Sequence, residues 1–160
     1  MVKYMRSIRR LLLPLILLLS VPLQAAEPDL TQMQQQAEQG DAWAQLNLGA
    51  AYDNGLGVEQ NVEQARHWYQ KAAEQGLAEA QFNLAHLLVT EEEQSALAAE
   101  WMLKAAKQGM ADAQYLMGVT YAEGIGVEEN EEKAIAWLQK AIAQGHEDAA
   151  TFLKQSYHLE

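Results

Sequence analysis

The sequence lacks cysteine and is poor in basic residues. Its 160 residues contain no Cys, and 11 Lys and Arg stand against 22 Asp and Glu, which gives a formal net charge of −11. Without cysteine the chain has no disulfide, no thiolate metal ligand, no cysteine nucleophile and no cysteine for lipid attachment. The acidity disfavours binding to nucleic-acid phosphates and to anionic lipid. Disorder from low hydrophobicity is also disfavoured, because the chain is 49% apolar with 4 Trp and 6 Tyr.

The first 25 residues have the three parts of a secretory signal peptide. Residues 1–10 are basic, residues 11–21 are almost wholly apolar, and residues 22–26 end in two alanines. The apolar run is well short of the about 20 residues that a membrane-spanning helix needs. We expect cleavage near Ala25 or Ala26, no stable membrane anchor afterwards, and a mature chain in the periplasm or outside the cell. The alternative is an uncleaved signal anchor.

An internal repeat organises the rest of the chain. Four related phrases, QAEQG, KAAEQG, KAAKQG and KAIAQG, follow one another at spacings of 36, 33 and 36 residues. Their final glycines are Gly40, Gly76, Gly109 and Gly145. A tryptophan precedes each of the last three glycines at the same distance, at Trp68, Trp101 and Trp137. A period of 33–36 residues with helical spacing is typical of stacked helix pairs.

Each repeat is expected to hold a first helix, A, and a second helix, B. The A helices are expected at residues 42–53, 78–89 and 111–123, and the B helices at residues 62–75, 92–108 and 131–144. Helices over residues 30–39 and 147–157 are expected to cap the stack, the second with Ala150, Phe152 and Leu153 facing inward.

The pattern within each repeat explains why it should fold this way. In the first B helix, Ala65, Trp68, Tyr69 and Ala72 are spaced i, i+3, i+4 and i+7, which places them on one apolar stripe. The tryptophans are expected to fill the space that the small alanines leave. The terminal glycine of each B phrase suits the left-handed residue that ends a helix.

The connections between A and B differ among the repeats. Two of them pair glycines, which supply positive φ, at Gly55, Gly57, Gly124 and Gly126. Val58 and Val127 are expected to enter the core after these turns. The middle repeat has Thr90 followed by three glutamates instead, which predicts an N-cap, a capping box and a tighter connection.

The phrases LG-x-x-Y-x-x-G-x-GV (residues 48–58), A-x-x-W-Y-x-KAAEQG (65–76) and YAEGIGV (121–127) resemble the Sel1-like repeat family, a relative of tetratricopeptide repeats. The resemblance covers about residues 30–157. It implies an all-α fold, a right-handed α-solenoid of about three helix pairs plus capping helices, about eight helices in all. The positions that match the family's structural pattern are Gly49, Tyr52, Gly55, Gly57, Ala65, Trp68, Gly76, Trp101, Gly109, Gly118, Tyr121, Gly124, Gly126, Trp137 and Gly145.

This resemblance divides the chain into a cleaved signal peptide and five further segments. Residues 26–40 form an N-terminal linker and capping helix, and residues 146–160 form a C-terminal capping helix. The three repeats between them span residues 41–76, 77–109 (with the shortened loop) and 110–145.

The resemblance also implies a function in protein binding. Members of the family are mostly adaptors and regulators of protein complexes, and some are immunity proteins for secreted toxins. We therefore expect a non-enzymatic adaptor or regulator of an envelope complex, with an immunity protein as the alternative. A cysteine-rich branch is linked to β-lactam hydrolysis, but this chain has no cysteine. Ser95 and Ser156, the serines beyond the signal peptide, lie in no G-x-S-x-G or S-x-x-K motif.

No cofactor or metal is expected from the remaining motifs. His146, Glu147 and Asp148 could form a weak surface metal site. A simpler interpretation is that the two acids begin a helix, where they face the positive end of its dipole. The acidic runs at residues 91–93 and 128–132 are interpreted in the same way, rather than as paired catalytic carboxylates.

A groove along the A helices is the candidate binding site. In tetratricopeptide repeats an Asn two residues before the small LG position often holds a ligand backbone, and by similarity this residue is Asn47 or Asn83, with Leu116 in the third repeat. The alternative is that these asparagines tie neighbouring A helices together or face water. The predicted groove comprises Trp43, Asn47, Asp53, Asn83, His86, Asp112, Leu116 and Val119. Leu116 and Val119 make its third-repeat end apolar, and the expected partner of this monomer is a protein or peptide of basic character.

Overall fold

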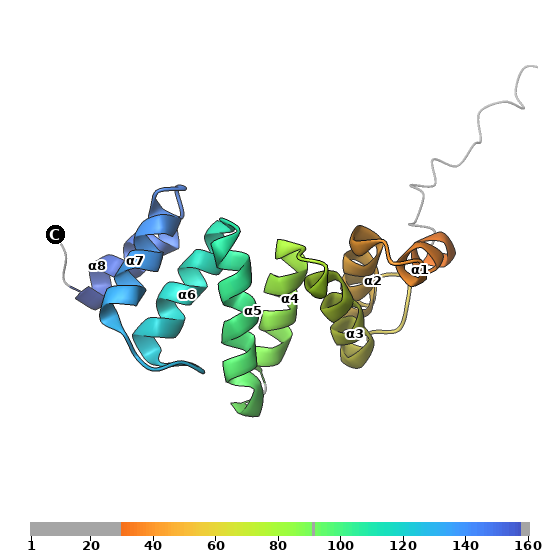
Figure 1. Cartoon of the computed structure of the whole chain (residues 1–160), viewed down its shortest axis with the longest axis horizontal. Coiled ribbons are helices and arrows are strands. Elements are labelled where there is room, and N and C mark those ends of the chain that lie inside the picture. The colour runs from red at the N-terminus through yellow and green to blue at the C-terminus, as the bar shows by residue number, and fades with distance from the viewer. Residues whose placement is uncertain (1–29, 91, 158–160) are drawn as a thin grey trace, which may run out of the picture.

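A computed structural model describes residues 30–90 and 92–157. The predicted signal peptide, with Ala25 and Ala26, lies outside the described residues, as do Glu91 and His158. The described part forms eight α-helices and one short 3-10 helix (Figure 1). In chain order they are α1 (Leu30–Glu38), α2 (Ala42–Asn54), α3 (Val62–Glu74), α4 (Ala78–Val89), η2 (Glu92–Gln94), α5 (Ser95–Lys107), α6 (Ala111–Glu123), α7 (Glu131–Ile142) and α8 (Glu147–Tyr157). None of these helices has the length and apolar character needed to cross a membrane.

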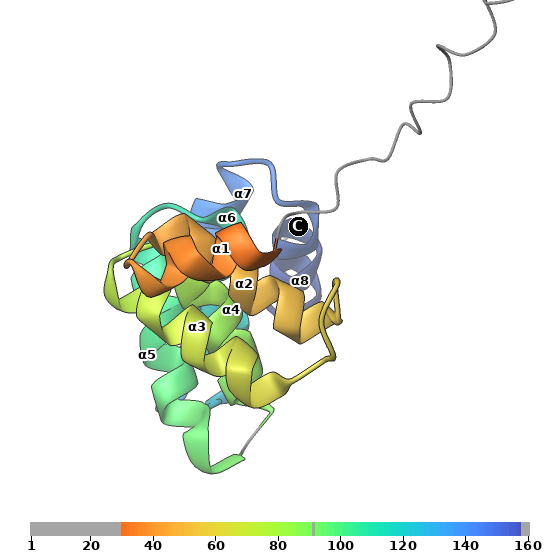
Figure 2. The same cartoon turned by 90° about the vertical axis from the view of Figure 1, so that its right-hand side faces the viewer.

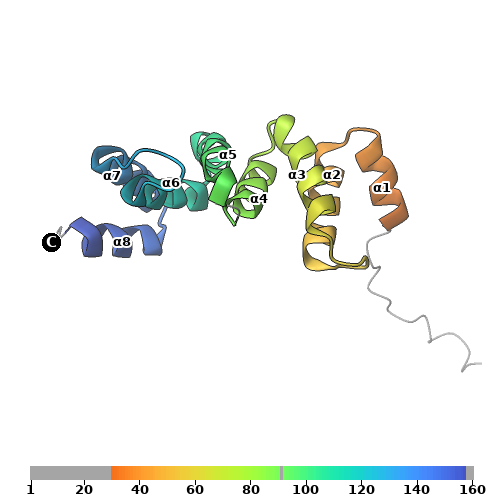
Figure 3. The same cartoon turned by 90° about the horizontal axis from the view of Figure 1, so that it is seen from below.

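The helices stack in chain order as a solenoid. The most extensive contacts join α2 to α3, α4 to α5 and α6 to α7, which are the A and B helices of each predicted repeat. Successive pairs then pack through α3 with α4 and α5 with α6. Figures 1 and 3 spread the stack from α1 to α8, and in the end-on view of Figure 2 the helices overlap in projection. The predicted all-α solenoid with about eight helices is confirmed.

Small residues on the A helices let the B helices approach closely. A Cβ added to Gly49 would lie 2.6 Å from the Tyr69 ring, and one added to Gly118 would lie 2.6 Å from Leu138. Tyr69 and Leu138 are among the largest fully buried side chains. The core is therefore built from glycine or alanine on one helix and a large apolar side chain on its partner.

The glycines that end the repeat phrases have the predicted left-handed conformation. Their φ angles are +96° for Gly40, +93° for Gly76, +96° for Gly109 and +85° for Gly145. Gly126, in the loop of the third repeat, has a further constraint besides its φ of +67°, because an added Cβ would collide with the Ser95 carbonyl. Glycine is required there both for conformation and for close backbone packing.

The three repeat tryptophans are less uniform than predicted. Trp68 is buried with 7% exposure, whereas Trp101 and Trp137 are half-buried and pack against the edge of the core clusters. Each ring lies beneath a lysine three residues along its helix. The ammonium-to-ring distances are 4.7 Å for Lys71 and Trp68, 3.5 Å for Lys104 and Trp101, and 4.0 Å for Lys140 and Trp137.

A glutamine network that the sequence analysis did not identify ties the repeats together. In its middle link, the Gln108 amide donates to the Gly76 carbonyl (2.8 Å) and to Gln81 Oε1 (2.9 Å), and the Gln81 amide donates to the Ala73 carbonyl (3.2 Å). One link therefore joins α3, α4 and the end of α5. The same geometry recurs between Gln75 and Gln45 and between Gln144 and Gln114. Gln45, Gln81 and Gln114 are buried, and their pairing satisfies polar groups that burial would otherwise penalise.

The connection in the middle repeat differs from its prediction. Thr90 does not cap the following helix, because its hydroxyl donates to the Leu87 carbonyl (2.8 Å) at the end of α4. The B helix begins as a 3-10 turn at residues 92–94 and becomes α-helical only at Ser95, where no side chain caps it. The connection is nonetheless tighter than in the other repeats, since residues 90–94 replace loops over residues 55–61 and 124–130.

Two smaller packing predictions are also corrected. In α8 the inward alanine is Ala149, which is fully buried, whereas Ala150 is exposed; Phe152 is half-buried as its neighbour in the core. Val58 and Val127 are half-buried and belong to no core cluster of the described residues. The loop glycines reverse the chain without sending these valines into the core.

Candidate binding surface

The A helices contain acids but no Lys or Arg, whereas the B helices contain charged residues of both signs. We call α2, α4 and α6 the A row and α3, α5 and α7 the B row; Figure 3 shows α4 and α6 on the other side of the stack from α5 and α7. The A row contains no Lys or Arg, and its acids are Asp53, Glu79, Asp112 and Glu123. The B row contains both basic residues, at Arg66, Lys71, Lys104, Lys107, Lys133 and Lys140, and acids, at Glu63, Glu74, Glu100, Glu131 and Glu132. The A row therefore attracts positively charged partners.

The predicted groove residues Trp43 and Asn47 lie together at the N-terminal end of this row. Both are exposed on α2, and Trp43 is 55% exposed. They line a polar cavity of about 320 Å³ to which Met33 and Gln36 of α1 also contribute. An exposed tryptophan beside an amide is typical of residues that carry binding energy at protein interfaces.

Asp53 and Asn83 meet at a buried tyrosine rather than in an open groove. The Tyr69 hydroxyl donates to Asp53 Oδ2 (3.4 Å) and also hydrogen-bonds Asn83. Burial, followed by the Asp53 charge, raises the pKa of Tyr69 well above its usual value. These contacts join α2, α3 and α4, so the side chains of Asp53 and Asn83 have a packing role here. That placement favours the alternative in which Asn83 links neighbouring helices.

His86, Leu116 and Val119 lie together at the next junction. They line an apolar pocket of about 250 Å³ between α4, α5 and α6. Alanines of α5 and Met102 form part of its wall. His86 is exposed, and Leu116 and Val119 are half-buried. The predicted apolar end of the groove is thus a pocket.

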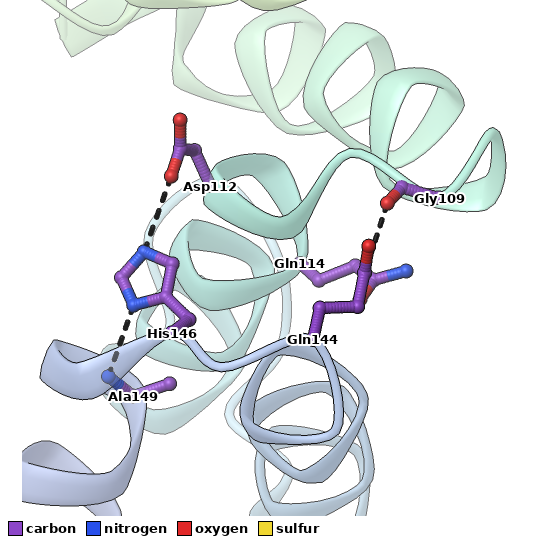
Figure 4. Close-up of polar contacts among 6 residues, drawn as sticks. All are labelled: Gly109, Asp112, Gln114, Gln144, His146 and Ala149. Carbon is purple, nitrogen blue, oxygen red and sulfur yellow. Dashed lines mark hydrogen bonds and ion pairs between the residues drawn. The ribbon is translucent and has the colours of Figure 1, made fainter.

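Asp112 pairs with the C-terminal cap. Its Oδ1 lies 3.3 Å from His146 Nε2, while His146 Nδ1 accepts from the backbone amide of Ala149 (3.2 Å) at the start of α8 (Figure 4). The His146 ring stacks on Tyr115 with centroids 4.7 Å apart. These partners account for His146 as the residue that caps α8, and Glu147 and Asp148 lie in the first turn of that helix, as the sequence analysis predicts.

The eight predicted groove residues therefore fall into four places. Trp43 and Asn47 share one cavity, and His86, Leu116 and Val119 share one pocket. Asp53 and Asn83 contact Tyr69, and Asp112 contacts His146. Ala99 and Met102 in the pocket wall were not predicted, although a comparison of equivalent positions between repeats could have identified both.

The described residues contain no group of three His, Asp or Glu side chains that could hold a metal ion. Tyr69 has its pKa raised and is buried, which makes its hydroxyl a poor nucleophile. The exposed aromatic, apolar and acidic groups of this surface are suited to binding a partner.

Stacked helix pairs, left-handed glycines between them and an acidic face define a helical-repeat solenoid of the protein-binding type. The Sel1 repeat matches three times, at residues 44–77, 78–110 and 111–146. The chain belongs to the Sel1 repeat family. Sel1 repeats generally mediate protein–protein interaction.

One relative of known sequence is the sel1-like repeat-containing protein L21 of Acanthamoeba polyphaga mimivirus. It is 43% identical over 54 residues, which are 34% of this chain and 10% of the relative. The chain thus spans about a tenth of the length of this curated relative.

Solved structures are similar over most of the chain. A Sel1 repeat protein from Oxalobacter formigenes is 38% identical with a TM-score of 0.71, covering 79% of this chain and 98% of its own. The protein c5321, a protective antigen present in uropathogenic Escherichia coli, is 36% identical with a TM-score of 0.75, covering 81% of this chain and 28% of its own. The Helicobacter pylori cysteine rich protein B shares the fold at 22% identity and a TM-score of 0.61, covering 81% of this chain and 98% of its own.

Proposed function

We propose that this chain is a non-enzymatic protein- or peptide-binding module that acts in the periplasm or outside the cell, as an adaptor or regulator of an envelope complex. The observation that carries the proposal is the A row, which combines the exposed Trp43, an apolar pocket and acids without any Lys or Arg. Such a face offers apolar contact area and electrostatic attraction to one partner. The immunity role stays a prediction from the resemblance.

Capture of a partner tests the binding role. The immobilised protein is exposed to an envelope extract of the source organism, and the double variant Asn47→Ala, Asn83→Ala is compared with the control Gln70→Ala on the exposed side of α3. We expect a retained protein that the double variant loses and the control keeps. Because Asn83 contacts Tyr69, the unfolding midpoints of all three proteins are measured first. If no protein is retained from any extract, the binding role is wrong; unchanged capture by the double variant would show that the asparagines are not part of the site.

The cellular location has a separate test. The basic, apolar and small-residue segments at residues 1–26 support export and cleavage. N-terminal sequencing of the protein from the envelope fraction is expected to begin at Ala26 or Glu27. A protein recovered from the cytoplasm with Met1 still at its start would contradict the proposed location.

Hydrolase activity offers a third test. The purified protein is expected not to turn over nitrocefin, because neither Ser95 nor Ser156 lies in a nucleophile motif. Turnover above the buffer rate that persists through repeated purification would contradict the non-enzymatic role.

A further inference from the structure

The pocket between α4, α5 and α6 arises from two substitutions between equivalent repeat positions. The B helices of the first two repeats align with an offset of 33 residues, so Ala99 is equivalent to Arg66, and Met102 is equivalent to Tyr69. The second repeat therefore has the small Ala99 in place of a long arginine. It also has the flexible Met102 in place of a tyrosine whose hydroxyl donates to Asp53. Both Ala99 and Met102 are buried in the pocket wall, with exposures of 6% and 7%.

The third repeat fills the same positions with aliphatic side chains. With an offset of 36 residues, Ile135 stands at the position of Ala99, and Leu138 stands at the position of Met102. Alanine thus occurs only in the second of the three repeats at this position. Leu116 differs in a similar way, because the equivalent A-helix residue of the second repeat is Asn83. The second junction therefore combines a small and a flexible residue of α5 with an apolar residue of α6, and these three residues line the pocket.

The size and lining of the pocket suit one apolar side chain. Its volume of about 250 Å³ exceeds the about 150 Å³ of an apolar cavity that admits benzene. Leu116, Val119 and Ile125 line it, and Val89 at its edge is 43% exposed. An aromatic or branched aliphatic group entering from solvent would bury apolar surface on all these residues.

The charge around the pocket indicates what carries that side chain. The pocket lining contains no Lys or Arg, all charged residues of the two A-row helices beside it, α4 and α6, are acids, and the chain carries a formal net charge of −11. Three of the Lys side chains on the B row lie over tryptophan rings on that row. An acidic or uncharged apolar segment gains nothing from this field, whereas Lys and Arg that flank the apolar residue are attracted by it.

We propose that the pocket between α4, α5 and α6 binds one aromatic or branched aliphatic side chain of a partner protein, presented by a segment in which Lys or Arg flank that residue. The proposal rests on the proposed binding function and names its contact point. Contact through Ala99, Met102 and Leu116 would distinguish the second junction from the other two. Salt weakens the association, because the flanking charges are screened.

Peptide selection tests the proposal. Random peptides displayed on phage are selected on the purified protein, and the recovered peptides are synthesised and titrated by fluorescence anisotropy. We expect sequences in which Lys or Arg flank an apolar residue, with affinity that falls when the basic residues are replaced by glutamine. Recovery of acidic sequences, or affinity that does not change on this replacement, would overturn the proposal.

Two variants then locate the site. Ala99→Ile introduces isoleucine, which the third repeat has at the equivalent position, Ile135. Leu116→Asn introduces asparagine, which the second repeat has at the equivalent position, Asn83. Each is expected to lower peptide affinity by at least about tenfold, because the pocket is filled or made polar. Ala136→Ile, the same change at an exposed position of α7, is the control and should leave affinity unchanged. Circular dichroism melting shows whether each variant is folded. If one pocket variant does not fold, the other still tests the pocket.

The outcomes separate this proposal from the proposed function. If both variants bind peptides as the parent does, the pocket is not the contact point. Loss of the same peptides in Asn47→Ala would then place binding in the cavity beside Trp43 and leave the binding function standing. If no peptide is selected and no protein is captured from the envelope extract, both proposals fail.

Discussion

Replacing Gln81 with alanine removes the centre of one glutamine link. The variant loses the donor to the Ala73 carbonyl and the acceptor for the Gln108 amide. Both partners keep one other hydrogen bond, because the Gly76 amide still donates to Ala73 and Gln108 still donates to Gly76. Two net hydrogen bonds at about 0.5–1.5 kcal/mol each, together with one buried methylene at about 0.8 kcal/mol, predict a loss of about 2–4 kcal/mol in the free energy of unfolding.

Urea unfolding followed by circular dichroism at 222 nm measures this loss. The matched control is Gln70→Ala, since the Gln70 amide bonds only Glu74 on the exposed side of α3 (2.9 Å). Its expected change is within about 0.5 kcal/mol. Gln108→Ala and the double variant complete a thermodynamic cycle, in which the coupling between Gln81 and Gln108 is expected at about 0.5–1.5 kcal/mol.

Two results would refute a stabilising role of the glutamine network. A loss in Gln81→Ala no larger than that in Gln70→Ala would show that the buried amide contributes nothing beyond a surface residue. A coupling of zero in the cycle would show that the two glutamines act independently. Either result would leave helix packing alone to set the register of the repeats.

Three further predictions follow from particular contacts. Gly126→Ala should cost more than Gly145→Ala, about 2–4 against about 1–2 kcal/mol in urea unfolding, because both have positive φ but only Gly126 meets the Ser95 carbonyl; equal losses would contradict this. His146→Ala should cost about 1 kcal/mol and speed amide hydrogen exchange in α8, since it removes a cap, whereas unchanged exchange would argue against the cap. Burial raises the pKa of Tyr69 above its usual 10.0, so the native state keeps the hydroxyl proton to a higher pH than the unfolded state does. The free energy of unfolding should therefore fall as the pH rises above that value. Tyr69→Phe should remove this part of the pH dependence, and an unchanged profile of stability against pH would refute the assignment.

Most of the fold could be predicted because the repeat supplies the same signals three times. The bounds of α4, α6 and α8 agree with their predictions, and the glycine that ends each B phrase has positive φ. Hydrophobic spacing and helix-ending glycines are local properties, so the sequence reports them directly. The prediction for the middle connection was wrong because Thr90 lies between the end of one helix and the start of the next. Its hydroxyl donates to the Leu87 carbonyl at the end of α4 and does not cap the helix that follows.

The candidate site was predictable only in part, because it depends on contacts between distant residues. Asp112 and His146 are far apart in sequence, and a pattern along one helix does not show that they meet. The family position of Asn83 is on the A row as expected, but its neighbour Tyr69 occupies its side chain. The pocket at Leu116 depends on the small size of Ala99. That small size stands out only when equivalent positions of the repeats are compared.

Photo-crosslinking tests the central claim, that the A row is the binding face, most directly. A photoreactive amino acid replaces the exposed Val89 at the edge of the pocket in one protein and the exposed Gln139 of α7 in another, and each is irradiated in the envelope of the source organism. We expect a discrete crosslinked protein from the position of Val89 and none from the position of Gln139. Crosslinking from Gln139 alone, or equally from both positions, would contradict it.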